Sequence, residues 1–359
     1  MKGPQGAALS TSSEAVASDA LEVPPVASNR GRQVRTTFVF GLLAVVVCLT
    51  APLVGTTHIS FARVFDRSIP FADNVDAQIF FIARLPRVLA AALVGSALAS
   101  SGVVLQALLR NPLATPFTLG VSAGAALGAM LAIAFGLDLG TLGVSSVPIA
   151  SFLGSMTATA IVYWLASRQR RGLSTNVLLL AGVTLNSFFS ALILFVQYLA
   201  DFTQSFRTVR WLMGDLDVGS YGPLLAALPL LVLAFAVFAV LPRTLNLLTL
   251  GTDVAAARGV DVLRAERLAF VSASLATGAA VSLAGPIGFI GIVVPHLVRL
   301  LVGADHRLVL PASALFGAAF LIACDLVSRT ALSPLELPVG IITAMIGGPF
   351  FLWLLVSRS

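Results

Sequence analysis

The sequence predicts an all-α, polytopic membrane protein with about ten transmembrane helices, and three observations lead to this fold class. Hydrophobic residues make up 58% of the 359 residues and charged residues only 11%, against about 25% in a soluble domain. The mean hydropathy is +0.98. The apolar residues gather in runs of about 20, the length that a helix needs to cross a bilayer, and they lack the alternation of β-barrel strands.

Residues 1–35 are polar, rich in Ser, Ala and Pro, and end in three arginines. This composition predicts a disordered cytoplasmic tail, because it offers too little apolar surface to fold. The segment is also too long and too polar for an ordinary signal peptide. We therefore expect the membrane domain to cover residues 36–359.

Ten apolar spans follow the tail. The seventh and eighth are separated only by GPIGFIG (285–291), whose glycines and proline break a helix, so we expect a tight turn or a partial helix there. The expected spans cover residues 37–57, 84–109, 117–137, 147–167, 176–200, 222–242, 267–285, 290–302, 308–328 and 338–356.

The distribution of cations predicts that both ends of the chain lie in the cytoplasm. With the N-terminus placed inside, fifteen of the 22 Lys and Arg residues fall in inside segments and seven in outside segments. The formal net charge of +6 therefore reflects loops that fix the orientation in the lipid bilayer, and we expect no nucleic-acid partner.

The densest cluster of charge, GTDVAAARGVDVLRAERL (251–268), falls in the largest cytoplasmic loop. Its composition favours short surface helices, and Gly259 is expected to end the first of them. A solvated connector is the alternative. Because Lys2 is the only lysine, the chain cannot form a P-loop, in which a lysine reaches the phosphates of a nucleotide. If nucleotide drives this protein, another polypeptide must bind it and must dock on the cytoplasmic side.

Three long stretches carry more information than composition does: RLPRVLAAALVGSALASSGVVLQALLRNPLATPFTLGVSAGAALGA (84–129), GPIGFIGIVVPHLVRLLVGADHR (285–307) and ELPVGIITAMIGGPFFLWLL (336–355). Together and in this order, they resemble the FecCD-type permeases of type II ABC importers, which carry ferric siderophores, haem or cobalamin. The resemblance covers about residues 38–356, which is everything except the tail.

The resemblance implies a permease subunit that works as a homodimer, or as one half of a pseudo-dimer, in the bacterial inner membrane. Two copies of a separate ATPase would bind ATP and Mg in the cytoplasm, so we expect no cofactor in this chain, and a periplasmic or extracellular binding protein would deliver the cargo. Cytoplasmic coupling helices, at about 246–266, would dock into a groove on the ATPase. The matching residues are Leu250, Gly251, Ala256, Ala257, Arg258 and Gly259.

Arginines at the outer ends of two spans oppose the usual bias of cations toward the inside. Arg84 and Arg87 begin the second span, and Arg329 ends the ninth. Snorkelling to lipid headgroups is one explanation. The resemblance implies another, in which these exposed arginines pair with one glutamate on each lobe of the binding protein. Asp325, four residues before Arg329, is placed to hold that side chain in position.

By resemblance, the fifth span lines a translocation path along the dimer axis. Its uncharged polar side chains would offer weak contacts to a bulky cargo. Hydrogen bonding between helices is the alternative, and spacing alone leaves the face of the helix undecided. The residues are Thr184, Asn186, Ser187 and Ser190.

We expect no catalytic and no metal-binding residue in this chain. The segment 120–124 fits G-x-S-x-G, but Gly120, Gly124 and Gly128 recur every four residues, which is typical of a close-packing helix face. An intramembrane hydrolase built on Ser122 is therefore a weak rival. The three histidines do not have metal-ligand spacing, and both cysteines fall inside apolar spans.

The expected function is thus that of a permease subunit that translocates a bulky metal chelate, foremost a ferric siderophore and otherwise haem or cobalamin. The main alternative is an ion-coupled secondary transporter that acts without an ATPase. Such a transporter ordinarily needs ionisable groups near the middle of the bilayer. The spans contain no pair of carboxylates, and Asp325 lies near the end of its span.

Overall fold

The computed structural model describes residues 30–55, 57–137, 146–168 and 174–357, and over these ranges the chain is all-α with no β-strand. The described helices include seven that are long and apolar enough to cross a membrane and three shorter apolar ones. The ten predicted spans are therefore confirmed. These helices are α1 (Arg30–Thr50), α4 (Leu85–Leu108), α5 (Val121–Ala134), α6 (Ser146–Ser167), α7 (Thr175–Leu199), α9 (Gly222–Val240), α12 (Val262–Ala284), α13 (Ile290–Val302), α14 (His306–Thr330) and α15 (Val339–Ser357).

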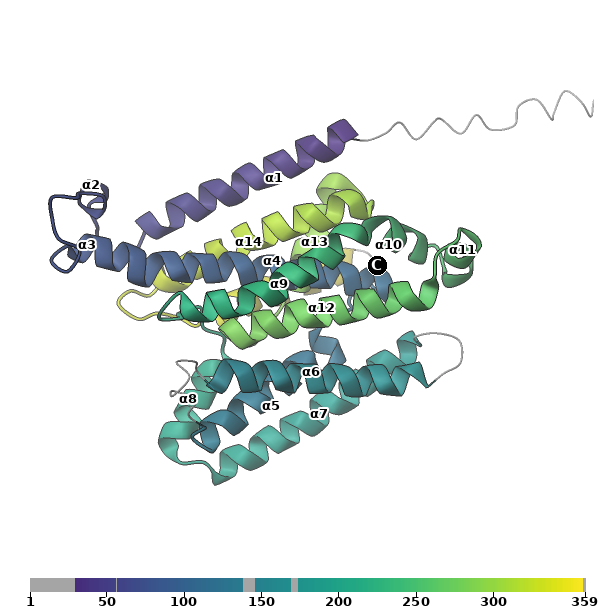
Figure 1. Cartoon of the computed structure of the whole chain (residues 1–359). Coiled ribbons are helices and arrows are strands. Elements are labelled where there is room, and N and C mark those ends of the chain that lie inside the picture. Colours follow the sequence, from purple (N-terminus) through teal and green to yellow (C-terminus); the bar gives the residue numbers. More distant parts are fainter. Residues whose placement is uncertain (1–29, 56, 138–145, 169–173, 358–359) are drawn as a thin grey trace, which may run out of the picture.

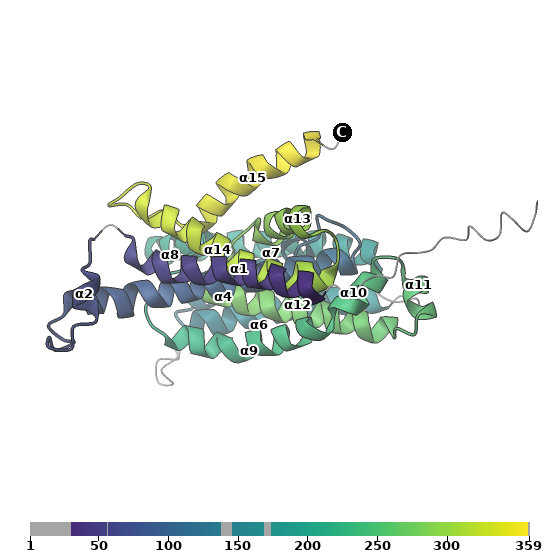
Figure 2. The ribbon, with the colours of Figure 1, turned by 90° about the horizontal axis from the view of Figure 1, so that it is seen from above.

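The remaining helices are short and connect the long ones. They are α2 (Phe61–Val64), α3 (Val75–Gln78), α8 (Phe202–Leu212), α10 (Pro242–Leu248) and α11 (Thr252–Ala257). Helices α2 and α3 lie at one end of the bundle, and α10 and α11 lie at the opposite end (Figures 1 and 2). We call these the α2–α3 end and the α10–α11 end.

Two predicted boundaries can be compared with the structure. The helix break expected at 285–291, as a tight turn or a partial helix, is confirmed as a non-helical turn, since α12 ends at Ala284, Gly285 has a φ of +69°, and α13 begins only at Ile290. The predicted end of the tail is corrected, because α1 begins at Arg30 and makes the last residues of that segment helical. Residues 1–29 lie outside the described ranges.

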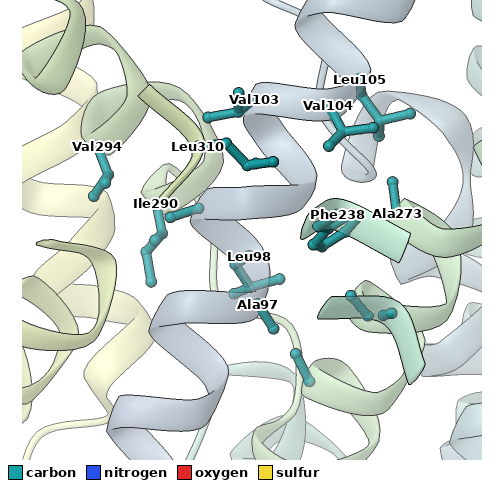
Figure 3. Packing of buried hydrophobic residues seen from close by; sticks show 14 of the residues in the cluster. Ala97, Leu98, Val103, Val104, Leu105, Phe238, Ala273, Ile290, Val294 and Leu310 are labelled. Atoms are coloured by element: carbon teal, nitrogen blue, oxygen red, sulfur yellow. The ribbon is translucent and has the colours of Figure 1, made fainter. Parts of the chain in front are cut away.

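Helix α4 lies at the centre of the core and is enclosed by α9, α12, α13 and α14 (Figure 3). Small residues let the backbones approach closely. A Cβ added at Gly95 of α4 would overlap the Gly317 carbonyl of α14, and one at Gly317 would overlap the Gly95 carbonyl. Because neither glycine can be enlarged without pushing the helices apart, α4 and α14 form one rigid pair.

The glycines of the G-x-S-x-G segment also serve packing. A Cβ at Gly124 would overlap Gly154 and Ala158 of α6, and one at Gly128 would overlap Ala150. The close-packing interpretation is therefore confirmed for Gly124 and Gly128, whereas Gly120 precedes α5 with a φ of +80° and lies beside α7 instead of α6. Ser122 is buried within helix α5 rather than placed on a strand-to-helix turn, so the nucleophile-elbow interpretation has no structural support.

Candidate functional site

The segment from Pro242 to Gly259 forms two short helices at the α10–α11 end. Helix α11 begins after Gly251, whose φ is +124°, and it is six residues long. It ends at Ala257, and Gly259 follows with a φ of +81°, a left-handed conformation that suits glycine just after a helix. The predicted short helix before Gly259 is therefore confirmed as α11, whereas residues 262–268 form the first turns of the long helix α12 and not a second short surface helix.

The residues assigned to coupling form the outer surface of this segment, and we call them the coupling element. Ala256, Ala257, Arg258 and Gly259 are exposed, whereas Ala255 is buried and anchors α11 to the bundle. Large apolar side chains are exposed beside them: Leu250 is 67% exposed and Leu263 is 61% exposed. Apolar and charged groups are thus mixed on one exposed surface at the end of the bundle, which is typical of a protein interface.

Helix α10 is tied to the start of α14 by the side chain of Asn246. Its amide nitrogen donates to Asp305 Oδ1 at 2.7 Å, and its oxygen accepts from the His306 backbone N–H at 2.9 Å. Burial would raise the pKa of Asp305, but hydrogen bonds from Arg307 and Asn246 outweigh burial and lower that pKa to about 2. Asp305 is therefore a carboxylate at any physiological pH.

At the α2–α3 end, three arginines gather around one buried carboxylate. Asp325 Oδ1 accepts from Arg87 Nε at 2.8 Å, and Asp325 Oδ2 lies 3.0 Å from Arg329 Nε. Glu336 Oε2 accepts from Arg87 Nη1 at 2.6 Å, and Arg84 donates to the carbonyls of Pro52 and Thr57. We call Arg84, Arg87, Asp325, Arg329 and Glu336 the outer cluster.

The expectation that these arginines are exposed is wrong. Arg84 is 6% exposed and Arg329 is 5% exposed, while the Arg87 side chain keeps only 11% of its surface. The reason is that Asp325 draws Arg87 and Arg329 inward, where each guanidinium is paired instead of solvated. The expectation that Asp325 holds Arg329 is confirmed. Snorkelling of the buried pair to headgroups has no support.

A pocket of about 220 Å³ opens over the outer cluster, and Arg84, Arg87 and Arg329 all line it. Glu336 and the exposed Asp217 also line it. Arg87 and Arg329 therefore already pair with carboxylates of their own chain, whereas Arg84 donates to backbone carbonyls. An acidic partner that enters this pocket has to replace one of these carboxylates, and Glu336, with 52% of its side chain exposed, is the accessible one.

Helix α7 separates the four polar residues predicted for the translocation path. Thr184, Ser187 and Ser190 are exposed along one stripe, and the first two hydroxyls also donate to carbonyls of their own helix. Asn186 is half-buried at the edge of this stripe and donates to the Phe117 carbonyl at 2.9 Å. For Asn186, the structure supports the alternative of hydrogen bonding between segments.

The sequence did not predict which residues pair with Arg87 in the outer cluster or with Asn246 at the α10–α11 end. Arg87 and Asp325 are 238 residues apart, and Asn246 and Asp305 are 59 residues apart, so no local spacing connects them. One signal was present: an acid such as Asp325 within an apolar span is costly unless paired. No comparable signal marks Asn246 or Glu336.

Comparisons with known proteins agree with this architecture. The sequence model of the FecCD transport family matches residues 42–357. The chain is 39% identical over 327 residues to the uncharacterized ABC transporter permease protein YvrB of Bacillus subtilis, covering 89% of this chain and 92% of that protein. It is 38% identical over 319 residues to the hemin transport system permease protein HmuU of Yersinia pestis, covering 88% and 94%.

Two further similarities extend the comparison. The chain is 46% identical over 281 residues to the cobalamin import system permease protein BtuC of Halobacterium salinarum, covering 77% of this chain and 73% of that protein. A solved ABC transporter chain in an inward-facing conformation superimposes with a TM-score of 0.78 at 35% identity, covering 90% of this chain and 99% of the other.

Proposed function

The chain belongs to the FecCD transport family, and we propose that it is the permease subunit of an ATP-driven importer whose energy enters through the coupling element. One observation carries the proposal: α11 and the exposed residues beside it lie at the opposite end of the bundle from α2 and α3 (Figure 1), the end that holds the outer cluster. Such an importer needs separate docking surfaces for an ATPase and for a protein that delivers cargo. These two ends offer one surface each.

We assign the α10–α11 end to the cytoplasm and the α2–α3 end to the outside of the bacterial inner membrane. The excess of Lys and Arg in the loops expected inside supports this orientation, because cytoplasmic loops carry the positive bias. Both termini then lie in the cytoplasm. The coupling element faces the compartment that contains ATP, and the outer cluster faces the compartment from which cargo arrives.

The complete transporter is proposed to contain two copies of this chain, two ATPase subunits and one binding protein. ATP and Mg belong to the ATPase, and no cofactor is assigned to this chain. Movement of the ATPase would displace α11, tilt the two permease copies and alternate access to a central path. Thr184, Ser187 and Ser190 are the α7 residues assigned to that path, because they share an exposed stripe.

The cargo is proposed to be a bulky metal chelate, in the first place a ferric siderophore. Relatives are named for hemin, for cobalamin and, in Helicobacter pylori, for iron chelatin transport. These molecules are large chelates, and neutral hydroxyls along α7 suit weak, passing contacts with them. ATPase stimulation measured with cargo-loaded binding protein, in parallel for a ferric siderophore, haem and cobalamin, identifies the cargo.

The rival function is an ion-coupled transporter without an ATPase. It is disfavoured because Asp325, a fully buried carboxylate in α14, is already paired with two arginines and offers no free site for a coupling ion. Proteoliposomes decide between the two. We expect uptake only when the ATPase and ATP are present. Uptake by this chain alone, driven by a proton or sodium gradient, would refute the proposed function.

Replacement of Glu336 with glutamine is expected to strengthen docking of the binding protein by about two- to fivefold. The change removes a negative charge from a half-exposed pair with Arg87, and exposed pairs are worth about 0.2–1 kcal/mol. Arg87 keeps Asp325 and gains a free face toward an incoming carboxylate. The Kd should be measured by surface binding to permease in nanodiscs.

Asp66→Asn is the control for that measurement. Asp66 is also an exposed carboxylate at the α2–α3 end, where it accepts from the Ser68 hydroxyl, but it lines neither of the pockets that contain Arg87 and Glu336. It should leave the Kd unchanged. Weaker binding by the Glu336→Gln variant would mean that Glu336 supports docking instead of competing with it.

A further inference from the structure

Helix α14 connects the two ends of the molecule. Asp305 and His306 stand at its start and contact α10, whereas Asp325 and Arg329 lie in its last turns within the outer cluster. At 1.5 Å per residue, its 25 residues span about 37 Å. A displacement at one end of a helix of this length is transmitted to the other end if the helix moves as a rigid body.

The packing of α14 favours rigid-body movement. Its backbone meets that of α4 directly at Gly95 and Gly317, a close packing that favours joint movement of the two helices. The outer cluster joins the same two helices again, because Arg87 belongs to α4 and Asp325 to α14. The Arg87–Asp325 ion pair thus joins α4 and α14 at their outer ends, and the glycine contacts join them near the middle of α14. We call this pair of helices the α4–α14 strut.

The side chain of Asn246 connects this strut to the coupling element. Its oxygen accepts from the His306 backbone N–H, which fixes the orientation of the amide, and it also lies 2.7 Å from His306 Nδ1. The amide nitrogen of the same Asn246 side chain donates to Asp305 Oδ1. Three short contacts from one side chain therefore hold α10 against the first turn of α14. Helix α11 follows α10 directly in the chain.

These contacts are more than a helix cap. Asp305 already caps α14 by accepting from the Arg307 backbone N–H at 3.0 Å, without help from α10. Helix α10 is also anchored by Leu245 and Leu248, which are buried. Neither helix needs Asn246 in order to form. The contacts of Asn246 instead fix the position of α10 relative to α14.

We propose that Asn246 is a positioning residue that transmits movement between the coupling element and the α4–α14 strut, and so links docking at the outer cluster to the ATPase. This inference rests on the proposed function. It predicts that breaking the Asn246 contacts spares assembly and basal ATP hydrolysis, because the exposed surface of α11 is unchanged. Stimulation by the binding protein is lost, because the outer signal no longer reaches that surface.

The test compares five permeases co-expressed with their ATPase and reconstituted in nanodiscs: wild type, Asn246→Leu, Asn246→Asp, the double variant Asn246→Asp with Asp305→Asn, and the control Thr249→Val. Thr249 is exposed on the turn after α10, and its hydroxyl donates to the Asn246 backbone carbonyl, so this control removes a polar group without touching α14. Measured quantities are ATPase co-purification, basal hydrolysis and the stimulation factor with cargo-loaded binding protein.

We expect Asn246→Leu to lose about fivefold or more of the stimulation, within the usual range of coupling between sites, while basal hydrolysis changes by less than about twofold. Asn246→Asp places two carboxylates side by side and should lose more. The double variant exchanges donor and acceptor between positions 246 and 305 and should recover stimulation. Thr249→Val should behave as wild type. Normal stimulation of Asn246→Leu, loss of its ATPase binding, or failure of the double variant to recover would each overturn the proposal.

A second measurement needs neither partner. Hydrogen–deuterium exchange of the permease alone should show faster exchange of the α10 and α11 amides in Asn246→Leu, with α14 unchanged beyond His306, whose backbone N–H loses its acceptor. Equal exchange in α10 and α11 would overturn the link. If wild-type permease fails to bind any ATPase but the exchange difference is present, the proposed function fails while the Asn246 link stands.

Discussion

Replacing Asp325 with asparagine is expected to destabilise the folded protein by about 3–5 kcal/mol, the cost of leaving a buried charge without its partner. The Asp325 side chain is fully buried, and it is the carboxylate that Arg87 and Arg329 share. Arg87 keeps Glu336 after the substitution, but Arg329, at 6% side-chain exposure, keeps only long contacts to backbone carbonyls. Thermal unfolding in detergent, monitored by size-exclusion chromatography, should show a large fall in the midpoint temperature.

A double variant separates the loss of charge pairing from a simple loss of shape. Asp325→Asn combined with Arg329→Gln removes both members of the buried pair, so it should be more stable than Asp325→Asn alone. Glu336→Gln is the exposed control and should cost less than about 1 kcal/mol. Additive losses in the double variant would show that the two side chains do not stabilise each other.

Replacing Gly259 with tryptophan is expected to abolish association with the ATPase. A Cβ built at this position meets open space within the described part of the chain, so the indole would project from the coupling element. The φ of +81° adds strain of order 1–2 kcal/mol for a residue with a side chain, which a large membrane domain can tolerate. The permease should therefore fold and insert, yet fail to co-purify with the ATPase.

Gly136→Trp is the matched control. Gly136 also has a left-handed backbone, with a φ of +57°, and open space around its Cβ within the described residues, but it follows α5 instead of α11. This variant carries a similar strain and the same added indole, and its ATPase binding should equal that of wild type. Normal co-purification and uptake by Gly259→Trp would remove the coupling element from the ATPase interface.

For the outer cluster, the sequence identified arginines that the structure brings together, but it did not predict that they are buried. Arg84, Arg87 and Arg329 were identified because outside cations are unusual, and the structure does bring them together. Their burial was not foreseen, because it depends on Asp325 and on loop carbonyls that approach from distant segments. Their role in docking a binding protein remains a prediction, now with Glu336 as a competing carboxylate.

The coupling element shows the opposite case. Its helices and the end at Gly259 follow from local composition and from the one residue that accepts a left-handed backbone at low cost, so they were predictable. Its attachment to α14 was not predictable, since a lone Asn246 in a loop gives no indication of a partner 59 or 60 residues further along.

The sequence by itself determined the number and order of the apolar helices, the break at 285–291 and the short helices at one end, because hydrophobic length and local backbone preference are properties of contiguous residues. Only the tertiary structure decided which charges are paired, that Asn186 faces Phe117 while Thr184 and Ser187 face outward, and that α14 joins the two ends. In a chain with this much apolar surface, many helix neighbours satisfy the hydrophobic pattern equally well. Close backbone contacts such as Gly95–Gly317, together with a few buried polar pairs, select one arrangement among them.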